Sequence, residues 1–266
     1  MKLIKNYSEI SNLLSKYYKA NSVTNIFLKK EDFEELIENK CLYYFENECG
    51  LFLLKRRACD YLCYFTLINT TINKEIEKFF KMRKIPVLIE LPQKKETKII
   101  LEAKNFFCNL GFINILERER YKLESLNTEN IKFKNISFAK EIDLKQVSYI
   151  LNYYYNVHTG CIPNDNMLLE DIKNNKIIIA KEEDKIIGLL HIEDSKNYSE
   201  IRHIVVLEYF RNKKIATSLV KYYHSFLESN KNAFVWVAKN NTTAIKLYEK
   251  NGYIKDTFYS SVFIKE

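Results

Sequence analysis

Glycine and proline are scarce in this chain of 266 residues, at five and three residues respectively, so each one is an informative mark of a turn or helix end. No apolar run approaches the roughly 20 residues that cross a bilayer. The segment after Met1 also lacks the charged-then-apolar pattern of a leader peptide. We therefore expect a soluble, cytoplasmic protein that needs no membrane, built as one large domain or two small ones.

Neither half of the chain has an excess of one charge. Lysine and arginine total 42 against 34 acidic residues, a net charge of +8, and a cut near Asn130 leaves +4 on each side. A nucleic-acid binder usually gathers its positive charge on one face or tail, so we expect no nucleic-acid partner. A modest positive field still favours a polyanionic cofactor.

The cysteines include no Cys-x-x-Cys pair, and the four histidines do not cluster near them. A zinc site needs several such ligands close together, so we expect no metal. Most of the cysteines stand in apolar, strand-like surroundings, which is typical of buried thiols in a reduced cytosolic protein. They are Cys41, Cys49, Cys59, Cys63, Cys108 and Cys161.

Hydrophobic periodicity is sharpest in the second half of the chain. It predicts two helices, three strands, a helix, a strand, a helix and a final strand. The expected helices cover 141–157, 168–172, 216–228 and 242–251, and the expected strands cover 177–180, 186–192, 200–206, 233–238 and 258–264.

The first half repeats this order with weaker punctuation. Both halves also share a corner of helix, glycine and aromatic residue, at 106–112 and at 247–253. We interpret the chain as a duplicated domain with domains at 1–127 and 128–266 and a polar seam near Ser125 to Lys134. The alternative is one irregular α+β domain. Expected helices in the first half are 33–38, 74–82 and 101–110, and expected strands are 41–46, 51–54, 61–68, 86–90 and 113–123.

The most specific stretch of the sequence is 200–219, where a buried strand leads through a basic turn into an amphipathic helix. Such a junction points backbone N–H groups and the positive end of the helix dipole at one spot. Arg211, Lys213 and Lys214 surround that spot. The arrangement suits a pyrophosphate.

With these residues the chain resembles the GNAT superfamily of acyl-CoA-dependent N-acetyltransferases. The family's turn, Arg/Gln-x-x-Gly-x-Gly/Ala, matches 211–216, and its later Asn-x-x-Ala-x-x-x-Tyr matches 241–248, before Gly252 and Tyr253. The resemblance implies an α+β fold of two tandem GNAT domains, each a mixed, mostly antiparallel sheet flanked by helices. The first copy is degenerate, because it lacks the phosphate turn and has Phe107 in place of the tyrosine.

The resemblance also implies a co-substrate, acetyl-CoA, and an amine acceptor. Backbone groups of the strand would receive the acetyl carbonyl and the pantetheine amide, and the turn would hold the pyrophosphate. Asn241 would hydrogen-bond the cofactor arm, or else cap the helix that follows it. The implied cofactor-binding residues are Ile204, Val205, Val206, Arg211, Asn212, Lys213, Lys214, Ile215, Ala216, Thr217 and Asn241.

Two residues are implied for catalysis. Tyr248 would protonate the departing CoA thiolate, which a phenol of pKa about 10 can do without large tuning; its alternative is a core tyrosine. Glu200, four residues before Ile204, would be the base. His203 and a chain of water molecules are the alternatives, and strand alternation predicts that Glu200 and His203 lie on opposite faces.

One departure from the family pattern is Lys214, which stands where the family usually has glycine. Lysine can keep the N–H donor there if its φ stays negative, and it adds a cation for phosphate. The acceptor is expected against 153–166, with Tyr154, Tyr155, His158 and Asp165 as candidate contacts.

Three broader expectations accompany this interpretation. The function alternative to an enzyme is a catalytically silent CoA-binding or protein-interaction module. The oligomeric state is expected to be a monomer or a homodimer. The abundance of lysine, isoleucine and asparagine is typical of an AT-rich bacterial genome.

Overall fold

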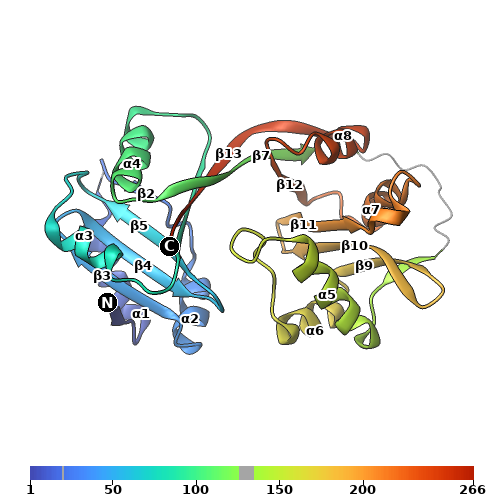
Figure 1. Cartoon of the computed structure of the whole chain (residues 1–266), viewed down its shortest axis with the longest axis horizontal. Coiled ribbons are helices and arrows are strands. Elements are labelled where there is room, and N and C mark those ends of the chain that lie inside the picture. Colours follow the sequence, from blue (N-terminus) through green and yellow to red (C-terminus); the bar gives the residue numbers. More distant parts are fainter. Residues whose placement is uncertain (20, 126–134) are drawn as a thin grey trace. The chain divides into compact units, whose positions relative to one another are not determined.

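The computed structural model describes residues 1–19, 21–125 and 135–266, and it divides into two compact units (Figure 1). The first unit is Met1–Glu117 with Phe258–Glu266, and the second is Arg118–Thr257. The boundary expected between residues 127 and 128, and most of the expected seam, lie outside the described residues. No helix in the described part of the chain is both long and apolar enough to span a membrane.

The first unit is a sheet with helices on both faces (Figure 1). Its strand order is β1-β3-β4-β5-β6-β13, with β2 added to β5. Helices α1 and α2 pack on one face of the sheet, and α3 and α4 on the other. The elements are β1 (Lys2–Leu3), α1 (Tyr7–Tyr17), β2 (Val23–Thr24), α2 (Lys30–Glu38), β3 (Leu42–Asn47), β4 (Gly50–Arg56), β5 (Tyr61–Leu67), α3 (Lys74–Lys81), β6 (Val87–Gln93) and α4 (Lys98–Asn109).

The second unit has the same layering. Its strand order is β7-β12-β11-β10-β9-β8, with α5 and α6 on one face and α7 and α8 on the other. The elements are β7 (Ile113–Leu123), β8 (Ile136–Phe138), the 3-10 turn η1 (Glu141–Asp143), α5 (Leu144–Tyr154), α6 (Asp165–Lys173), β9 (Ile177–Glu182), β10 (Lys185–Asp194), β11 (Tyr198–Val206), the 3-10 turn η2 (Glu208–Phe210), α7 (Ile215–His224), β12 (Asn232–Ala238), α8 (Thr242–Lys250) and β13 (Tyr253–Lys265).

Central strands of both units are buried on both faces, which explains their nearly continuous apolar sequence. In β4, Phe52 packs with α3 and α4, whereas Leu51 and Leu53 pack with α1 and α2. In β10, Leu190 packs with α7 and Leu189 with α5 and α6. Each unit therefore has two separate hydrophobic layers with the sheet between them.

Each expected helix and strand is present, but the structure adds four elements and shifts the ends of others. The helix α1 was not expected from the sequence; its buried Ile10, Leu13 and Tyr17 anchor an otherwise polar segment. The two-residue strands β1 and β2 and the short β8 were not expected either, because only pairing with a neighbour defines them. The helix α7 ends at His224 rather than at residue 228, and β13 begins at Tyr253 rather than at residue 258.

The two glycine corners have the same geometry. Gly111 and Gly252 follow α4 and α8 with φ of +85° and +89°, the left-handed conformation that ends a helix and favours glycine. The aromatic residues after them, Phe112 and Tyr253, are both buried in the cores of their units. The shared corner that the sequence shows is therefore also a shared structure.

The strands that follow these corners change units. β7 follows the corner of the first half, and from Arg118 to Lys122 it pairs with β12 of the second unit. β13 follows the corner of the second half, and from Tyr259 to Lys265 it pairs with β6 of the first unit. Each half of the sequence thus gives its last strand to the sheet formed mainly by the other half.

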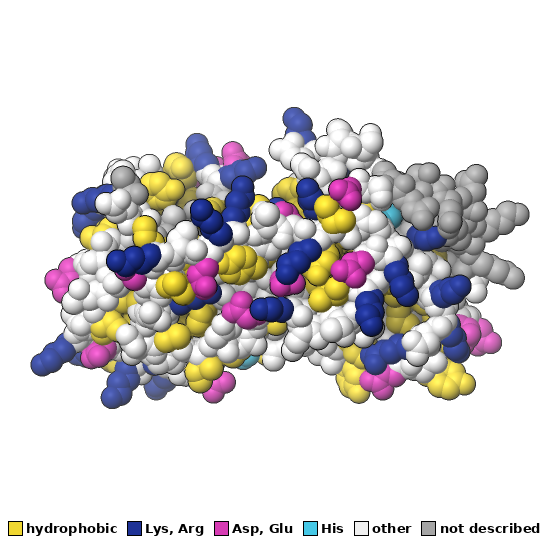
Figure 2. Space-filling model, turned by 90° about the horizontal axis from the view of Figure 1, so that it is seen from above, with side chains coloured by type: hydrophobic (Ala, Val, Ile, Leu, Met, Phe, Trp, Pro, Cys, Tyr) yellow, Lys and Arg dark blue, Asp and Glu magenta, His cyan; other side chains and the backbone are white. Residues whose placement is uncertain are grey.

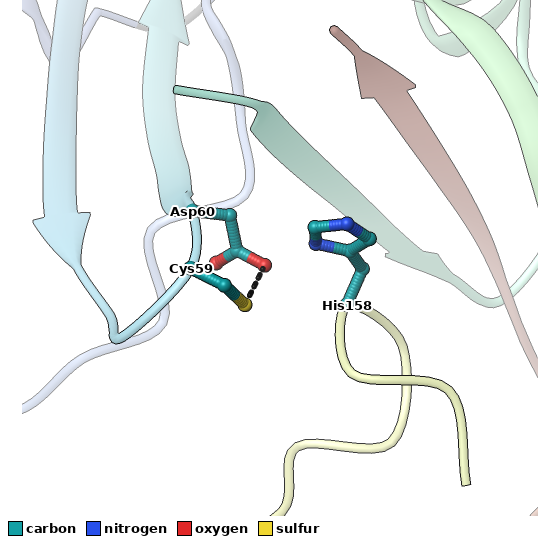
Figure 3. Close-up of side chains that lie close together, drawn as sticks. All are labelled: Cys59, Asp60 and His158. Atoms are coloured by element: carbon teal, nitrogen blue, oxygen red, sulfur yellow. Dashed lines mark hydrogen bonds between the residues drawn. The ribbon is translucent and has the colours of Figure 1, made fainter. Parts of the chain in front are cut away.

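On the face shown in Figure 2, lysine and arginine side chains are spread out, with acidic side chains among them. None of the six cysteines forms a disulfide, but only Cys49 and Cys63 are buried, so the expectation of generally buried thiols is wrong. In the first unit, Cys59 Sγ lies 3.4 Å from a carboxylate oxygen of Asp60, which is buried and ion-paired with Arg57 (Figure 3).

Candidate acyl-CoA site

Two parallel strands of the second unit diverge near the middle of its sheet. β11 and β12 are paired from Tyr198 with Asn232 to Ile201 with Val235, and the pairing ends there. At the same point β11 has a bulge: His191 and Ile192 of β10 face His203 and Ile201, which leaves Arg202 as the extra residue. A bulge bends its strand and ends pairing, so it accounts for the opening between β11 and β12.

The bulge also changes which side chains share a face. Residues directly opposite each other in an antiparallel pair point to the same face. Glu200 is opposite Glu193, and His203 is opposite His191. His191 and Glu193 are two residues apart on β10 and share a face, so Glu200 and His203 also lie on the same face. The expectation that they lie on opposite faces is wrong, because simple alternation does not account for the inserted Arg202.

Beyond the open part of β11, the basic turn leads into α7. Asn212 and Lys214 both have left-handed backbones, with φ of +64° and +61°. Lys214 is the N-cap residue of α7. The condition of a negative φ at Lys214 is therefore not met: lysine adopts here the conformation that glycine would adopt. Left-handed residues that lead into a helix N-terminus direct backbone N–H groups toward a common point, which is an anion-binding geometry.

The side chains of the turn are exposed. The Lys213 Nζ atom lies 4.9 Å from the ring centres of both Tyr209 and Phe210. Arg211 donates from Nε to the carbonyl oxygen of Val206 at 3.2 Å. The cationic side chains of Arg211 and Lys213 are therefore held by contacts with η2 and with the end of β11.

The backbone of Ile204 is already hydrogen-bonded to a side chain. Its N–H donates to the Tyr155 hydroxyl at 2.9 Å, and the same hydroxyl donates to the Ile204 carbonyl oxygen at 3.0 Å. Tyr155 follows α5, and its ring packs edge-on against His203. Burial raises the pKa of Tyr155 to about 12, so its hydroxyl stays protonated at neutral pH. The sequence suggested an acceptor contact for Tyr155 and gave no sign of this bond to β11.

Tyr248 lies on the buried face of α8, only 3% exposed, with its ring edge-on to Tyr253. Burial raises its pKa well above the usual range, and nearby Tyr155 adds to the shift. Asn241 caps α8, because its side-chain oxygen accepts from Ala244 N–H at 3.1 Å. Tyr248 is thus a core tyrosine and Asn241 a helix cap, which are the alternatives that the sequence raised for these two residues.

His203 forms part of a buried chain of hydrogen bonds. Its Nε2 lies 2.7 Å from the carbonyl oxygen of Gly160, and its Nδ1 lies 3.1 Å from Nδ1 of His191. His191 Nε2 in turn lies 3.1 Å from Asp171. A carbonyl only accepts, so we assign the His203 proton to Nε2 and the proton between the two rings to His191.

This chain makes His203 a poor general base. Burial, with a smaller contribution from His191, lowers the pKa of His203 to about 3, and both of its ring nitrogens are engaged. Its visible role is to tether the loop that contains Gly160 to β11. Glu200 is partly exposed and lies in the paired part of β11, before the opening.

The matching opening in the first unit is filled. β5 and β6 are paired in parallel from Tyr61 to Cys63, and beyond Cys63 the Asn25 side chain bridges them. It donates to the carbonyl oxygens of Cys63 and Glu90 and accepts from Phe65 N–H, at 3.2, 2.9 and 2.6 Å. β2 then pairs with the end of β5. This edge is thus occupied by the chain itself.

Sheet, bulge, opening and turn together define the acyl-CoA N-acyltransferase fold. Residues 173–255 match the family model described as an acetyltransferase (GNAT) domain. No curated protein matches the chain. The chain has the GNAT fold, as the solved structures of similar architecture show.

The alignments with three of those structures cover most of this chain and most of the other chain. A GCN5-related N-acetyltransferase from Sphaerobacter thermophilus is 12% identical, with a TM-score of 0.60 over 100% of this chain and 94% of that one. A GNAT-family acetyltransferase from Colwellia psychrerythraea is 12% identical, with a TM-score of 0.54 over 99% and 98%. A tandem GNAT protein from the clavulanic acid biosynthesis pathway is 9% identical, with a TM-score of 0.53 over 82% and 79%.

Proposed function

We propose that the second unit transfers an acetyl group from acetyl-CoA to a primary amine by direct attack in a ternary complex. The observation that carries the proposal is the opening between β11 and β12, which lies on the same strand that runs into the left-handed turn before α7. An opened strand edge offers backbone groups to a thioester and an amide. The adjoining turn offers N–H groups and cations to a pyrophosphate.

Each residue has a role that its position supports. Ile204, Val205 and Val206 offer strand groups to the acyl-pantetheine arm, and residues 211–217 hold the pyrophosphate. Asn241 uses its oxygen to cap α8, so its side-chain N–H groups are the ones offered to the cofactor arm.

The chemical step follows from these positions. The neutral amine nitrogen attacks the thioester carbonyl carbon, a new C–N bond forms, and the C–S bond breaks. The thiolate sulfur takes the Tyr248 proton. Burial raises the pKa of Tyr248, so the phenol carries its proton at working pH but is a weaker acid than a free tyrosine, and this shift counts against the acid role. Before the attack, the acceptor ammonium loses one proton through water toward Glu200, which lies four residues, about 13 Å of strand, before Ile204. After the C–N bond forms, the amide nitrogen sheds its extra proton, which restores the Tyr248 phenol.

A second candidate function is a catalytically silent CoA-binding or protein-interaction module. The specific observation in its favour is that Tyr155 already occupies the Ile204 backbone groups. A silent CoA-binding module differs from the enzyme in turnover, and a protein-interaction module lacks CoA binding as well.

The test is calorimetric titration with acetyl-CoA, followed by free-thiol release over a panel of primary amines. We expect binding by the wild-type protein and by Tyr248→Phe within about twofold of each other, because the lost hydroxyl acts on the leaving group. We expect kcat of Tyr248→Phe to fall by about 10²-fold, the usual size of a general-acid contribution. Tyr223→Phe, which alters another buried tyrosine of the same unit, is the matched control and should keep wild-type turnover.

Three other results would change the conclusion. Equal turnover in Tyr248→Phe and wild type would remove the acid role from Tyr248. Binding without turnover on any amine would favour the silent module. Absence of acetyl-CoA binding would overturn the enzyme and the CoA-binding module and leave the protein-interaction module.

A further inference from the structure

The edge of β11 that the opening exposes is capped by the protein's own side chains. An N–H or C=O group at such an edge costs free energy if it is buried without a partner. The Tyr155 hydroxyl satisfies both groups of Ile204 at once, since it accepts at 2.9 Å and donates at 3.0 Å. Arg211 Nε covers the Val206 carbonyl oxygen two residues further on.

Both caps are connected to the end of α5. Tyr155 is the residue directly after the helix, with an extended backbone at φ −113° and ψ 143°. The ring of Tyr154, just before it, lies under the Arg211 guanidinium at 5.9 Å. Two consecutive tyrosines thus contact the strand groups and the turn arginine that the proposed function assigns to acyl-CoA.

We propose that Tyr155 is the internal occupant of the acyl-oxygen position on β11 and thereby sets the affinity for the acyl-pantetheine part of the cofactor. The inference rests on the proposed function. Acyl-CoA binds when its thioester oxygen replaces the Tyr155 hydroxyl at Ile204 N–H. The turn holds the nucleotide part of acyl-CoA, and Tyr155 does not compete with that part for binding.

Comparison with the first unit shows why this cap is removable. There the equivalent edge is closed by a segment of chain: Asn25 makes three bonds to backbone groups of β5 and β6, and β2 adjoins it as a strand. In the second unit a single hydroxyl on a mostly buried side chain caps Ile204. One side-chain rotation exposes Ile204, whereas opening the first unit requires the loss of strand pairing.

The experiment compares two ligands on three full-length proteins by calorimetry. The ligands are acetyl-CoA and 3′,5′-ADP, which carries the 3′-phosphate and one of the two pyrophosphate phosphates of CoA but no pantetheine or acyl group. The proteins are wild type, Tyr155→Phe and the control Tyr153→Phe. Tyr153 lies on α5, is 65% exposed and stacks on Tyr149, so its hydroxyl is remote from β11.

Removing the Tyr155 hydroxyl leaves Ile204 uncapped in the ligand-free protein and removes the competitor. We expect Tyr155→Phe to bind acetyl-CoA about tenfold more tightly, because the binding-competent fraction rises. Its affinity for 3′,5′-ADP should stay within about twofold of wild type, and Tyr153→Phe should match wild type for both ligands.

Unchanged or weaker acetyl-CoA binding by Tyr155→Phe, with 3′,5′-ADP unaffected, overturns the inference and leaves the proposed function standing. Weaker binding of both ligands assigns Tyr155 a purely structural role and overturns it too. If wild type binds neither ligand, the proposed function fails and this inference fails with it.

A measurement on the wild-type protein covers the case in which the variant does not fold. The Ile204 amide resonance should move when acetyl-CoA is added and stay in place when 3′,5′-ADP is added. A resonance that is unmoved by acetyl-CoA at saturation contradicts the exchange of partners at Ile204 N–H.

Discussion

At the scale of single residues, the conformation of Lys214 is the clearest departure from what its side chain favours. Its φ of +61° lies in the left-handed region, where an L residue with a β-carbon costs roughly 1 kcal/mol. Asn212, also left-handed, is a residue type that tolerates this region. The turn thus keeps a glycine-like shape while it carries a cation.

We expect Lys214→Gly to raise the free energy of unfolding by about 0.5–1 kcal/mol, since relief of the left-handed strain exceeds the added chain entropy. We also expect acetyl-CoA affinity to fall a few-fold at low salt, because the proposed function places the Lys214 cation at the pyrophosphate. Urea denaturation and calorimetry measure the two effects.

Lys213→Gly is the matched control, because it makes the same lysine-to-glycine change at the preceding residue, which has no positive φ. It should lower stability, as glycine normally does. A Lys214→Gly protein that is destabilised as much as Lys213→Gly would contradict the strain argument.

At the scale of elements, the position of α7 depends on its close packing against β10. A β-carbon added at Gly188 would lie 3.0 Å from Ile215 Cγ2, 3.2 Å from the Val205 carbonyl oxygen and 3.3 Å from Leu219 Cδ1. Ile215 is the first residue of α7 and follows the turn directly. The lack of a side chain at Gly188 therefore lets the helix start, and with it the turn, lie close to the sheet.

We expect Gly188→Val to displace the start of α7. Its cost in unfolding free energy should be about 1–3 kcal/mol, the usual cost of overpacking. Acetyl-CoA affinity of the folded protein should fall about tenfold, because misplacing a binding group by about 1 Å is costly. Thermal denaturation and calorimetry check both.

Ile192→Val separates stability from positioning. Ile192 lies on the same strand in the same core, and its truncation should cost about 0.5–1.5 kcal/mol while leaving affinity unchanged. Equal affinity loss in both variants would show that general destabilisation, rather than the place of α7, weakens binding.

At the scale of the whole molecule, the two halves of the sequence are not the two compact units. The exchanged ends of β7 and β13 complete the sheets of the second and first unit respectively. Phe263, three residues from the last, is 2% exposed and belongs to the core of the first unit. Stability of the first unit is therefore tied to residues that the sequence places at the end of the second half.

We expect Phe263→Ala to cost about 3–5 kcal/mol through loss of buried surface and cavity formation. Hydrogen exchange should show the lost protection in β5 and β6 of the first unit, with β9 to β11 little changed. Val237→Ala, in β12 of the second unit, is the counterpart and should weaken protection in the second unit. Protection lost first in β9 to β11 of Phe263→Ala would contradict the assignment of β13 to the first unit.

Local patterns in the sequence determined much of this protein. Most helices and strands, the two glycine corners and the presence of a basic turn before α7 were predictable, because periodicity and helix ends are short-range properties of the chain. The left-handed backbone of Lys214 was not predicted.

Only the tertiary structure decided the bulge at Arg202, the capping of Ile204 by Tyr155 and the exchange of β7 and β13. Each depends on pairing between residues far apart in sequence, and several registers satisfy the same alternation of apolar side chains. Adding one residue at the bulge placed Glu200 and His203 on one face, against simple alternation. The sequence therefore specified the parts of the candidate site, and long-range pairing specified which of them meet.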